Sequence, residues 1–109
     1  INAVTGAKGF PEAVLIRALE PVAGRELMRK RRGFDKDEDL CSGPGKLTEA
    51  LGITKQHNQG RLTGSPVYIA QGSERKRPVG VSGRIGLAEG RGEEMPLRYF
   101  CEDSTCVSR

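Results

Sequence analysis

The sequence predicts an α+β fold built around an antiparallel β-sheet. Helical patterns lie in the first half of the 109 residues, whereas strand patterns gather mostly in the second half. Fifteen glycines and six prolines divide the chain into short elements. Hydrophobic residues make up 36% of the chain, which is enough for one small core. We therefore expect residues 1–109 to form one domain or part of one, and the start at Ile1 suggests a fragment.

The first two strands are expected to form a hairpin. Residues 13–19 are the longest apolar run, rich in β-branched and aliphatic side chains, and Pro21 follows it. Residues up to Val4 read as the partner strand, and the glycines within residues 5–9 provide a turn.

A helix and a charged loop follow the hairpin. Residues 24–32 have helical character, with Leu27 and Met28 on one side and basic residues around the rest. Gly33 is a plausible stop, because glycine readily adopts the left-handed conformation that ends helices. Residues 34–40 then read as a charged loop.

A second helix is expected after this loop. Ser42 is an acceptable N-cap, Pro44 suits the first helical position, and Gly52 closes the helix. The apolar face of this helix consists of Leu47, Ala50 and Leu51.

Three further strands are expected in the second half of the chain. They cover residues 67–71, 79–88 and 97–102, and glycine, proline or charged residues bound each of them. The connecting turns span residues 72–78 and 89–96.

Arg17 places a charge inside the longest apolar run. On an extended strand it shares a face with Leu15 and Leu19. A guanidinium on such a face must find a carboxylate or line a wet cavity, because an unpaired buried charge costs several kcal/mol. Glu12 and Glu20 are the nearest acids, but their odd offsets place them on the opposite face. Two interpretations stay open: a structural ion pair with a distant acid, or a site arginine.

The charge balance is compatible with a polyanionic partner. Eighteen basic against fourteen acidic residues give a net charge of +4, which many other proteins share. Residues 25–32 hold five basic residues, and residues 35–39 are mainly acidic. A solvated helix end and loop would give the same pattern.

The cysteines and the histidine do not suggest a metal site. Cys41, Cys101 and Cys106 form no CxxC pair and lack metal-ligand spacing with His57. His57 lies in a polar loop, where we expect it to make surface hydrogen bonds. The sequence shows no signal peptide and no apolar stretch near about 18 residues, so we expect a cytoplasmic protein without a membrane span and with reduced thiols.

A Gly-Pro-Gly-Lys run at the start of the second helix invites comparison with a phosphate-binding loop. The Walker A motif fails, because Leu40 and Leu47 occupy positions that require Gly and Ser or Thr. Gly43 and Gly45 still allow a phosphate to approach the N–H groups of a helix start, and Lys46 adds positive charge. A capped helix with an exposed lysine explains the same residues.

Several short motifs in a fixed order resemble the 3-methyladenine DNA glycosylases of the alkyladenine glycosylase family, in their bacterial form, over residues 2–109. The motifs are Ala-Val-Leu-Ile-Arg-Ala-Leu-Glu-Pro (13–21), Gly24 with Met28 and Arg29, Leu-Cys-Ser-Gly-Pro-Gly-Lys-Leu (40–47), Ala-Leu-Gly-Ile (50–53), Leu-Thr-Gly-Ser-Pro (62–66), Arg-Ile-Gly-Leu (84–87), Pro-Leu-Arg-Tyr-Phe (96–100) and Val-Ser (107–108).

The resemblance implies a curved antiparallel sheet, a partial barrel, with a few short helices. The chain would be the truncated C-terminal half of this single-domain fold. The family performs base-excision repair as monofunctional hydrolases: it flips a purine such as 3-methyladenine, 7-methylguanine or hypoxanthine out of double-stranded DNA and hydrolyses its N-glycosidic bond. It uses no metal or cofactor. A monomeric, nucleoid-associated bacterial protein is implied.

The resemblance also assigns residues to the attacking water. Arg17 corresponds to an arginine that holds this water, and Ile85 to the residue whose backbone carbonyl helps to position it. The glutamate that activates the water belongs to the N-terminal half of the family, so the chain alone is expected to be inactive. Cys106 stands where many relatives carry tryptophan.

Further residues correspond to the base pocket and the DNA backbone contact. Asn2 corresponds to the asparagine that clashes with the 2-amino group of guanine, and Leu15 to an apolar pocket residue. Lys46, beside Gly43 and Gly45, corresponds to a lysine that contacts a DNA phosphate.

Two other functions are compatible with the residues alone. A non-catalytic nucleic-acid-binding module would show salt-sensitive binding that depends on Lys46 and not on Arg17. A structural protein would use Arg17 in a core ion pair, so its removal would cost stability.

Overall fold

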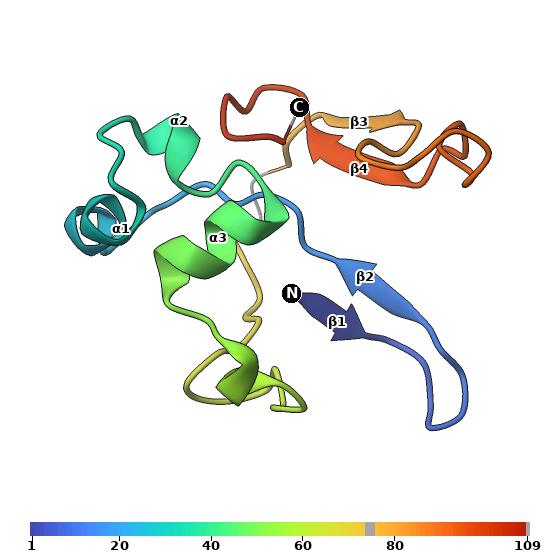
Figure 1. Ribbon diagram of the computed structural model, residues 1–109, viewed down its shortest axis with the longest axis horizontal. Helices are drawn as coiled ribbons and strands as arrows, with labels where there is room; N and C mark the ends of the chain where they lie inside the picture. The colour runs from blue at the N-terminus through green and yellow to red at the C-terminus, as the bar shows by residue number, and fades with distance from the viewer. Residues whose placement is uncertain (74–75, 109) are drawn as a thin grey trace.

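The computed structural model describes residues 1–73 and 76–108, and within them the α+β prediction is confirmed (Figure 1). The helices lie on one side of the molecule, and the strands pair as two separate two-stranded antiparallel sheets rather than one continuous curved sheet. The elements in order are β1 (Asn2–Val4), β2 (Ala13–Leu15), α1 (Arg25–Arg32), α2 (Asp37–Leu40), α3 (Pro44–Leu51), the 3-10 helix η1 (Lys55–His57), β3 (Val79–Ser82) and β4 (Arg98–Cys101).

The predicted hairpin forms between β1 and β2, with Asn2 opposite Leu15. One more backbone bond, from Ile16 N to Ile1 O at 2.9 Å, extends the ladder. The predicted strand over residues 13–19 is wrong in its second half. The chain leaves the hairpin there because the backbone N–H of Leu19 donates to Cys41 O, at 3.1 Å, ahead of α3.

The second sheet pairs β3 with β4, with Val81 opposite Tyr99. The strand predicted over residues 97–102 is confirmed, but the one predicted over residues 79–88 ends at Ser82. The chain turns there, and a side chain on Gly83 would place its Cβ 2.6 Å from Glu93 O. Only glycine therefore allows the following loop to fold back this closely.

The strand predicted over residues 67–71 is wrong. Its one ladder contact is an isolated bridge between Thr63 and Tyr68, supported by a bond from Ile69 N to Leu62 O. In the described chain no neighbouring strand extends this bridge. Residues 74 and 75 of the predicted turn over residues 72–78 lie outside the described residues.

Both predicted helices form, and glycine ends each of them. Gly33 and Gly52 have φ values of 69° and 68°, which glycine adopts without strain. Pro44 opens α3 as expected, but the N-cap is Gly43 and not Ser42. The hydroxyl of Ser42 instead accepts a hydrogen bond from the ammonium of Lys46, at 3.4 Å.

A short helix, α2, replaces the second half of the loop predicted over residues 34–40. Asp37 at its start pairs with Arg29 of α1 at 2.7 Å and with Arg25 at 3.5 Å. Leu40 at its end is fully buried. The charged segment therefore folds as a helix because Asp37 pairs with two arginines of α1 and Leu40 joins the hydrophobic core.

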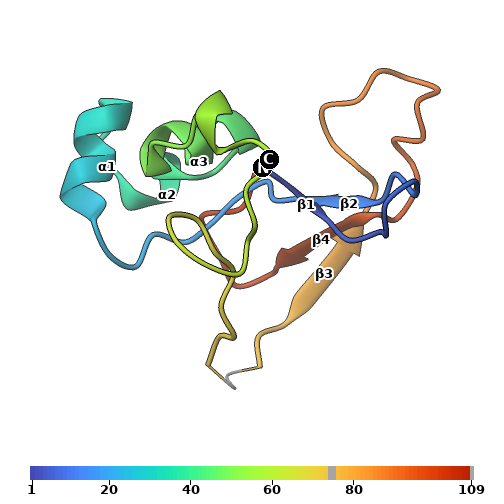
Figure 2. The same cartoon turned by 90° about the horizontal axis from the view of Figure 1, so that it is seen from below.

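A small hydrophobic core lies among the three helices. It consists of Met28, Leu40, Cys41, Leu47 and Ala50, with Ile1 and Ile16 packed against it. Viewed at right angles, both sheets extend away from this helical unit (Figure 2).

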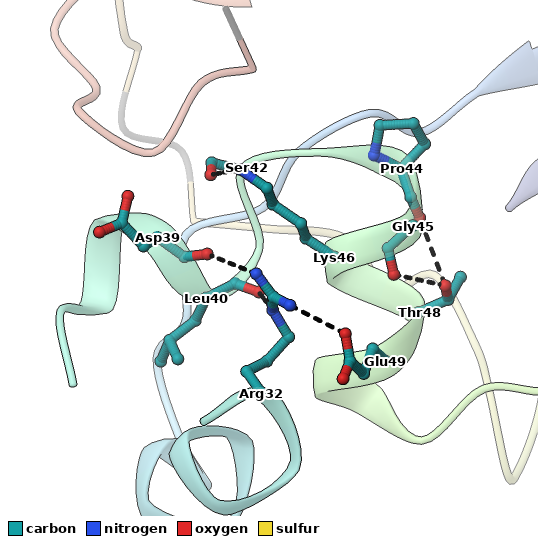
Figure 3. A network of polar contacts seen from close by, with 9 residues as sticks. All are labelled: Arg32, Asp39, Leu40, Ser42, Pro44, Gly45, Lys46, Thr48 and Glu49. Atoms are coloured by element: carbon teal, nitrogen blue, oxygen red, sulfur yellow. Dashed lines mark hydrogen bonds and ion pairs between the residues drawn. The ribbon is translucent and has the colours of Figure 1, made fainter. Parts of the chain in front are cut away.

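Arg32 joins the three helices by polar contacts (Figure 3). Its guanidinium donates to Leu40 O at 3.1 Å and to Glu49 Oε2 at 2.8 Å, while the side chain is only 9% exposed. It also lies 4.8 Å from the ring centroid of Phe34. Within the described residues, no helix is both long and apolar enough to cross a membrane.

Replacing Leu47 by alanine is expected to lower the free energy of unfolding by about 2–5 kcal/mol, because it leaves a cavity in a core of few side chains. Urea denaturation of the chain measures this loss. Leu51→Ala on the same helix, where the side chain is 36% exposed, is the control. Equal losses for the two variants would contradict the assignment of the core.

Candidate functional site

Arg17 lies two residues after β2, and its half-buried guanidinium has no carboxylate partner in the described part of the chain. Its Nε donates to the hydroxyl of Ser108 at 3.3 Å. Glu20, one of the nearby acids, forms a two-point ion pair with Arg77 at 2.7 and 2.9 Å. The described residues therefore give no support to a structural ion pair at Arg17. Its positive charge is not compensated by a described carboxylate.

Arg17 lies close to the residue that follows Ile85 in the chain. Gly86 follows Ile85 directly, and a Cβ built on Gly86 would lie 3.8 Å from Nη2 of Arg17. Gly86 has a φ of 77°, a conformation that favours glycine. The turn after Ile85 therefore approaches the charged end of Arg17, although no hydrogen bond joins the two segments.

A cavity of about 440 Å³ lies beside Arg17. Leu15, Arg17, Arg98 and Ser108 contribute to its lining, together with apolar side chains of β4. The cavity is open to solvent on one side, and its lining combines apolar side chains with charged groups such as Arg17 and Arg98.

Asn2 opens onto a different cavity. It is opposite Leu15 in the hairpin register, but it lines a space of about 1080 Å³ between β1 and residues 53–67. Lys55, His57 and Arg61 line the same space. The structure thus aligns the two predicted pocket residues on neighbouring strands without placing them in one cavity.

The predicted phosphate-contact residues gather at the start of α3. Gly43 is buried, whereas Gly45 and Lys46 are exposed. Lys46 reaches back over the first turn towards Ser42 (Figure 3). A Cβ on Gly43 would lie 3.4 Å from Cδ of Lys46, so the glycine gives the lysine stem room. The described contacts of Lys46 do not connect it to Arg17.

His57 makes a local hydrogen bond, as predicted. Its Nδ1 accepts from the backbone N–H of Thr54 at 2.9 Å and caps η1. All three cysteines are free, and burial raises the pKa of the Cys41 and Cys106 thiols. Within the described residues no cluster of three or more His, Cys, Asp or Glu side chains could hold a metal ion.

Sequence reasoning missed the residues that hold the C-terminal segment. Arg98 of β4 donates from Nη2 to the carbonyl of Ser108 at 2.7 Å. Arg77 bridges Glu20 and Asp103, and hydrogen bonds to these two carboxylates raise the pKa of Arg77 above its ordinary value. The resemblance marked residues 107–108 as a motif, but nothing in the local spacing indicated these contacts.

A network of hydrogen bonds fixes the loop that follows Ile85. Arg84 donates to Arg91 O at 2.9 Å and to Gly92 O at 3.1 Å. The carboxylate of Glu93 accepts from the backbone N–H of Gly90 at 2.9 Å and of Arg91 at 3.0 Å. These backbone bonds, led by that of Gly90, lower the pKa of Glu93.

Comparison with known proteins gives a consistent family match. Residues 1–105 match the sequence model of the family described as methylpurine-DNA glycosylase. A Bacillus licheniformis protein is 47% identical over the whole chain, which covers 56% of that protein. A Methanoculleus marisnigri protein is 42% identical over the whole chain, covering 58%. A Salinibacter ruber protein is 46% identical over 99% of the chain, covering 52%.

All three relatives bear the name "Putative 3-methyladenine DNA glycosylase". The chain spans about half the length of these curated relatives.

The bonds of Glu93 predict a loop that loosens in acid. Because its pKa is lowered in the folded chain, the carboxylate stabilises the loop above its ordinary pKa of about 4.3, and this stabilisation is lost as the pH falls through the folded value. The protection factors of the Gly90 and Arg91 amides against hydrogen exchange, measured by NMR, should fall over this range.

Glu93→Gln should abolish this pH dependence, whereas Glu94→Gln, at a neighbouring exposed position, should preserve it. Equal acid sensitivity in the wild type and in Glu93→Gln would contradict the assignment.

Proposed function

The chain belongs to the methylpurine-DNA glycosylase family, and we propose that the protein excises damaged purines from DNA in base-excision repair. The observation that carries this proposal within the structure is Arg17. Its half-buried guanidinium has a hydroxyl partner but no ion pair in the described chain, and its tip faces the turn after Ile85.

The proposed reaction is hydrolysis of the N-glycosidic bond of a flipped-out purine. A water forms the new bond to the sugar carbon, the bond to the purine nitrogen breaks, and a carboxylate takes the proton of the water. Arg17 and the carbonyl of Ile85 would orient this water. The carboxylate would come from outside residues 1–109, in the part of the family that this chain does not match.

The proposed substrates are alkylated or deaminated purines such as 3-methyladenine, 7-methylguanine and hypoxanthine. Asn2 would exclude normal guanine by a clash with its 2-amino group, and Leu15 would supply an apolar contact. The described chain leaves Leu15 42% exposed beside the cavity of Arg17, which is compatible with this role. The proposed reaction needs no cofactor.

The proposed partner is double-stranded DNA. A phosphate would approach the start of α3, where Gly45 and Lys46 are exposed and Lys46 supplies positive charge, with Gly43 buried behind them as the N-cap. The net charge of +4 favours such a polyanion. We propose that the protein acts as a monomer in the bacterial cytoplasm, close to the nucleoid.

The chain alone is expected to release neither 3-methyladenine nor hypoxanthine from duplex DNA. A chimera that joins it to the part of the Bacillus licheniformis relative that it does not match should release at least one of them. Base release from alkylated and inosine-containing duplexes measures this. Activity of the isolated chain, or none in the chimera, would contradict the proposal.

In the chimera, Arg17→Met is expected to lower the single-turnover rate of base release by about 10²-fold or more, because the attacking water loses a charged partner. The dissociation constant for duplex DNA should change little. A non-catalytic nucleic-acid-binding module would instead show no base release in either protein, and this result would favour that alternative.

Lys46→Ala in the chimera is expected to weaken duplex binding and to reduce the dependence of log K on log salt by about 0.9, the value for one phosphate contact. Fluorescence anisotropy at several salt concentrations measures both changes. Lys8→Ala, on the turn of the β1–β2 hairpin, is the matched control and should leave the slope unchanged. Equal slopes for the two variants would exclude Lys46 as a phosphate contact.

A further inference from the structure

We infer that Ser108 is a positioning residue for Arg17 and that Arg98 anchors it; this inference rests on the function proposed above. The hydroxyl of Ser108 accepts from Nε of Arg17 at 3.3 Å. Its backbone carbonyl accepts from Nη2 of Arg98 at 2.7 Å. One buried serine thus connects the site arginine to β4.

The hydrogen bond to Ser108 uses Nε of Arg17 and leaves the two terminal nitrogens, Nη1 and Nη2, free to bind another group. The terminal nitrogens of Arg17 have no partner among the hydrogen bonds and ion pairs of the described chain. One of them, Nη2, lies 3.8 Å from the place that a Cβ would take on Gly86. Ser108 therefore holds the guanidinium of Arg17 at Nε, while Nη2 lies towards the turn after Ile85.

The anchor of Ser108 is well fixed. Nη1 of Arg98 donates to the hydroxyl of Ser82 on β3 at 3.1 Å, so the guanidinium spans the two strands. It also lies 4.2 Å from the ring centroid of Phe100, close enough for a cation–π contact. Ser108 itself is only 6% exposed. Contacts with the β3–β4 sheet thereby set the position of the hydroxyl that Arg17 meets.

The sheet accepts Phe100 in this place because Gly80 lies opposite it. A Cβ on Gly80 would come within 2.5 Å of the ring. The ring, the arginine above it and the serine carbonyl therefore form one packed unit.

Positioning matters here because an arginine side chain has several rotatable bonds, and a reacting water must be held in a narrow range of geometries. Loss of the Ser108 hydroxyl would leave Arg17 charged and present but free to rotate. The distance of 3.3 Å is at the long end for such a bond, so we expect a moderate effect on rate rather than its abolition.

Arginine side-chain NMR on the 109-residue chain tests the contact without requiring activity. The Nε–H signal of Arg17, assigned by its loss in Arg17→Lys, should be slow to exchange in the wild type. It should exchange about tenfold faster in Ser108→Ala, as expected when one hydrogen bond is lost, and be restored in Ser108→Thr. Arg98→Met should also accelerate it.

Ser104→Ala is the matched control, because Ser104 is equally buried and its hydroxyl accepts from Cys106 N rather than from Arg17. It should leave the signal of Arg17 unchanged. Equal exchange in Ser108→Ala and Ser104→Ala would overturn the inference.

The chimera tests the consequence for catalysis. Ser108→Ala should lower the single-turnover rate by about tenfold with an unchanged dissociation constant for DNA, and Ser108→Thr should restore the rate. A fall in affinity without a fall in rate would overturn the positioning role. An inactive unsubstituted chimera would contradict the proposed function instead, and the NMR comparison would still decide whether Ser108 orients Arg17.

Discussion

The attachment of Ile16 to the helical core is the constraint on which the site depends. Ile16 packs against the core between the three helices, and Leu19 adds a backbone bond to Cys41. The residues on either side of Ile16, Leu15 and Arg17, are not part of the core and line the adjacent cavity. The end of the hairpin and the segment that follows it thereby place Leu15 and Arg17 beside the same cavity.

Residues far from Arg17 in the sequence, in the second half of the chain, also hold its side chain. Arg98 holds the C-terminal segment on β4, and that segment supplies the hydroxyl for Arg17. Arg77 fastens the same segment, through Asp103, to Glu20, which lies three residues beyond Arg17. The guanidinium of Arg17 therefore depends on contacts between the two ends of the chain, whereas the helical core supports only its backbone.

The local features were predictable, and those that depend on distant contacts were not. Glycine caps such as Gly33 and the amphipathic pattern of α3 are local, and both were confirmed. The end of β2 was missed because it is decided by the bond from Leu19 to Cys41. Likewise, α2 depends on the pairing of Asp37 with α1, which no periodicity within residues 34–40 could indicate.

The candidate site shows the same division. The described ion pairs do not join Arg17 to Glu12 or Glu20, as expected, but strand parity is not the reason, because β2 ends at Leu15. The family resemblance paired Arg17 with Ile85, and the structure places the residue after Ile85 near Arg17. The contact with Ser108 joins residues 91 positions apart, so spacing alone could not reveal it. For Asn2 the strand pairing was predictable but its place in the site was not. It lies opposite Leu15 in the hairpin, yet the two residues line different cavities.

The central claim is that Arg17 is held for function and contributes little to folding. The free energy of unfolding of Arg17→Met, compared with the wild-type chain in urea, tests it directly. The loss of one hydrogen bond to a serine predicts a decrease of about 1 kcal/mol or less. A decrease of about 3–5 kcal/mol, as expected when a buried ion pair is broken, would contradict the claim.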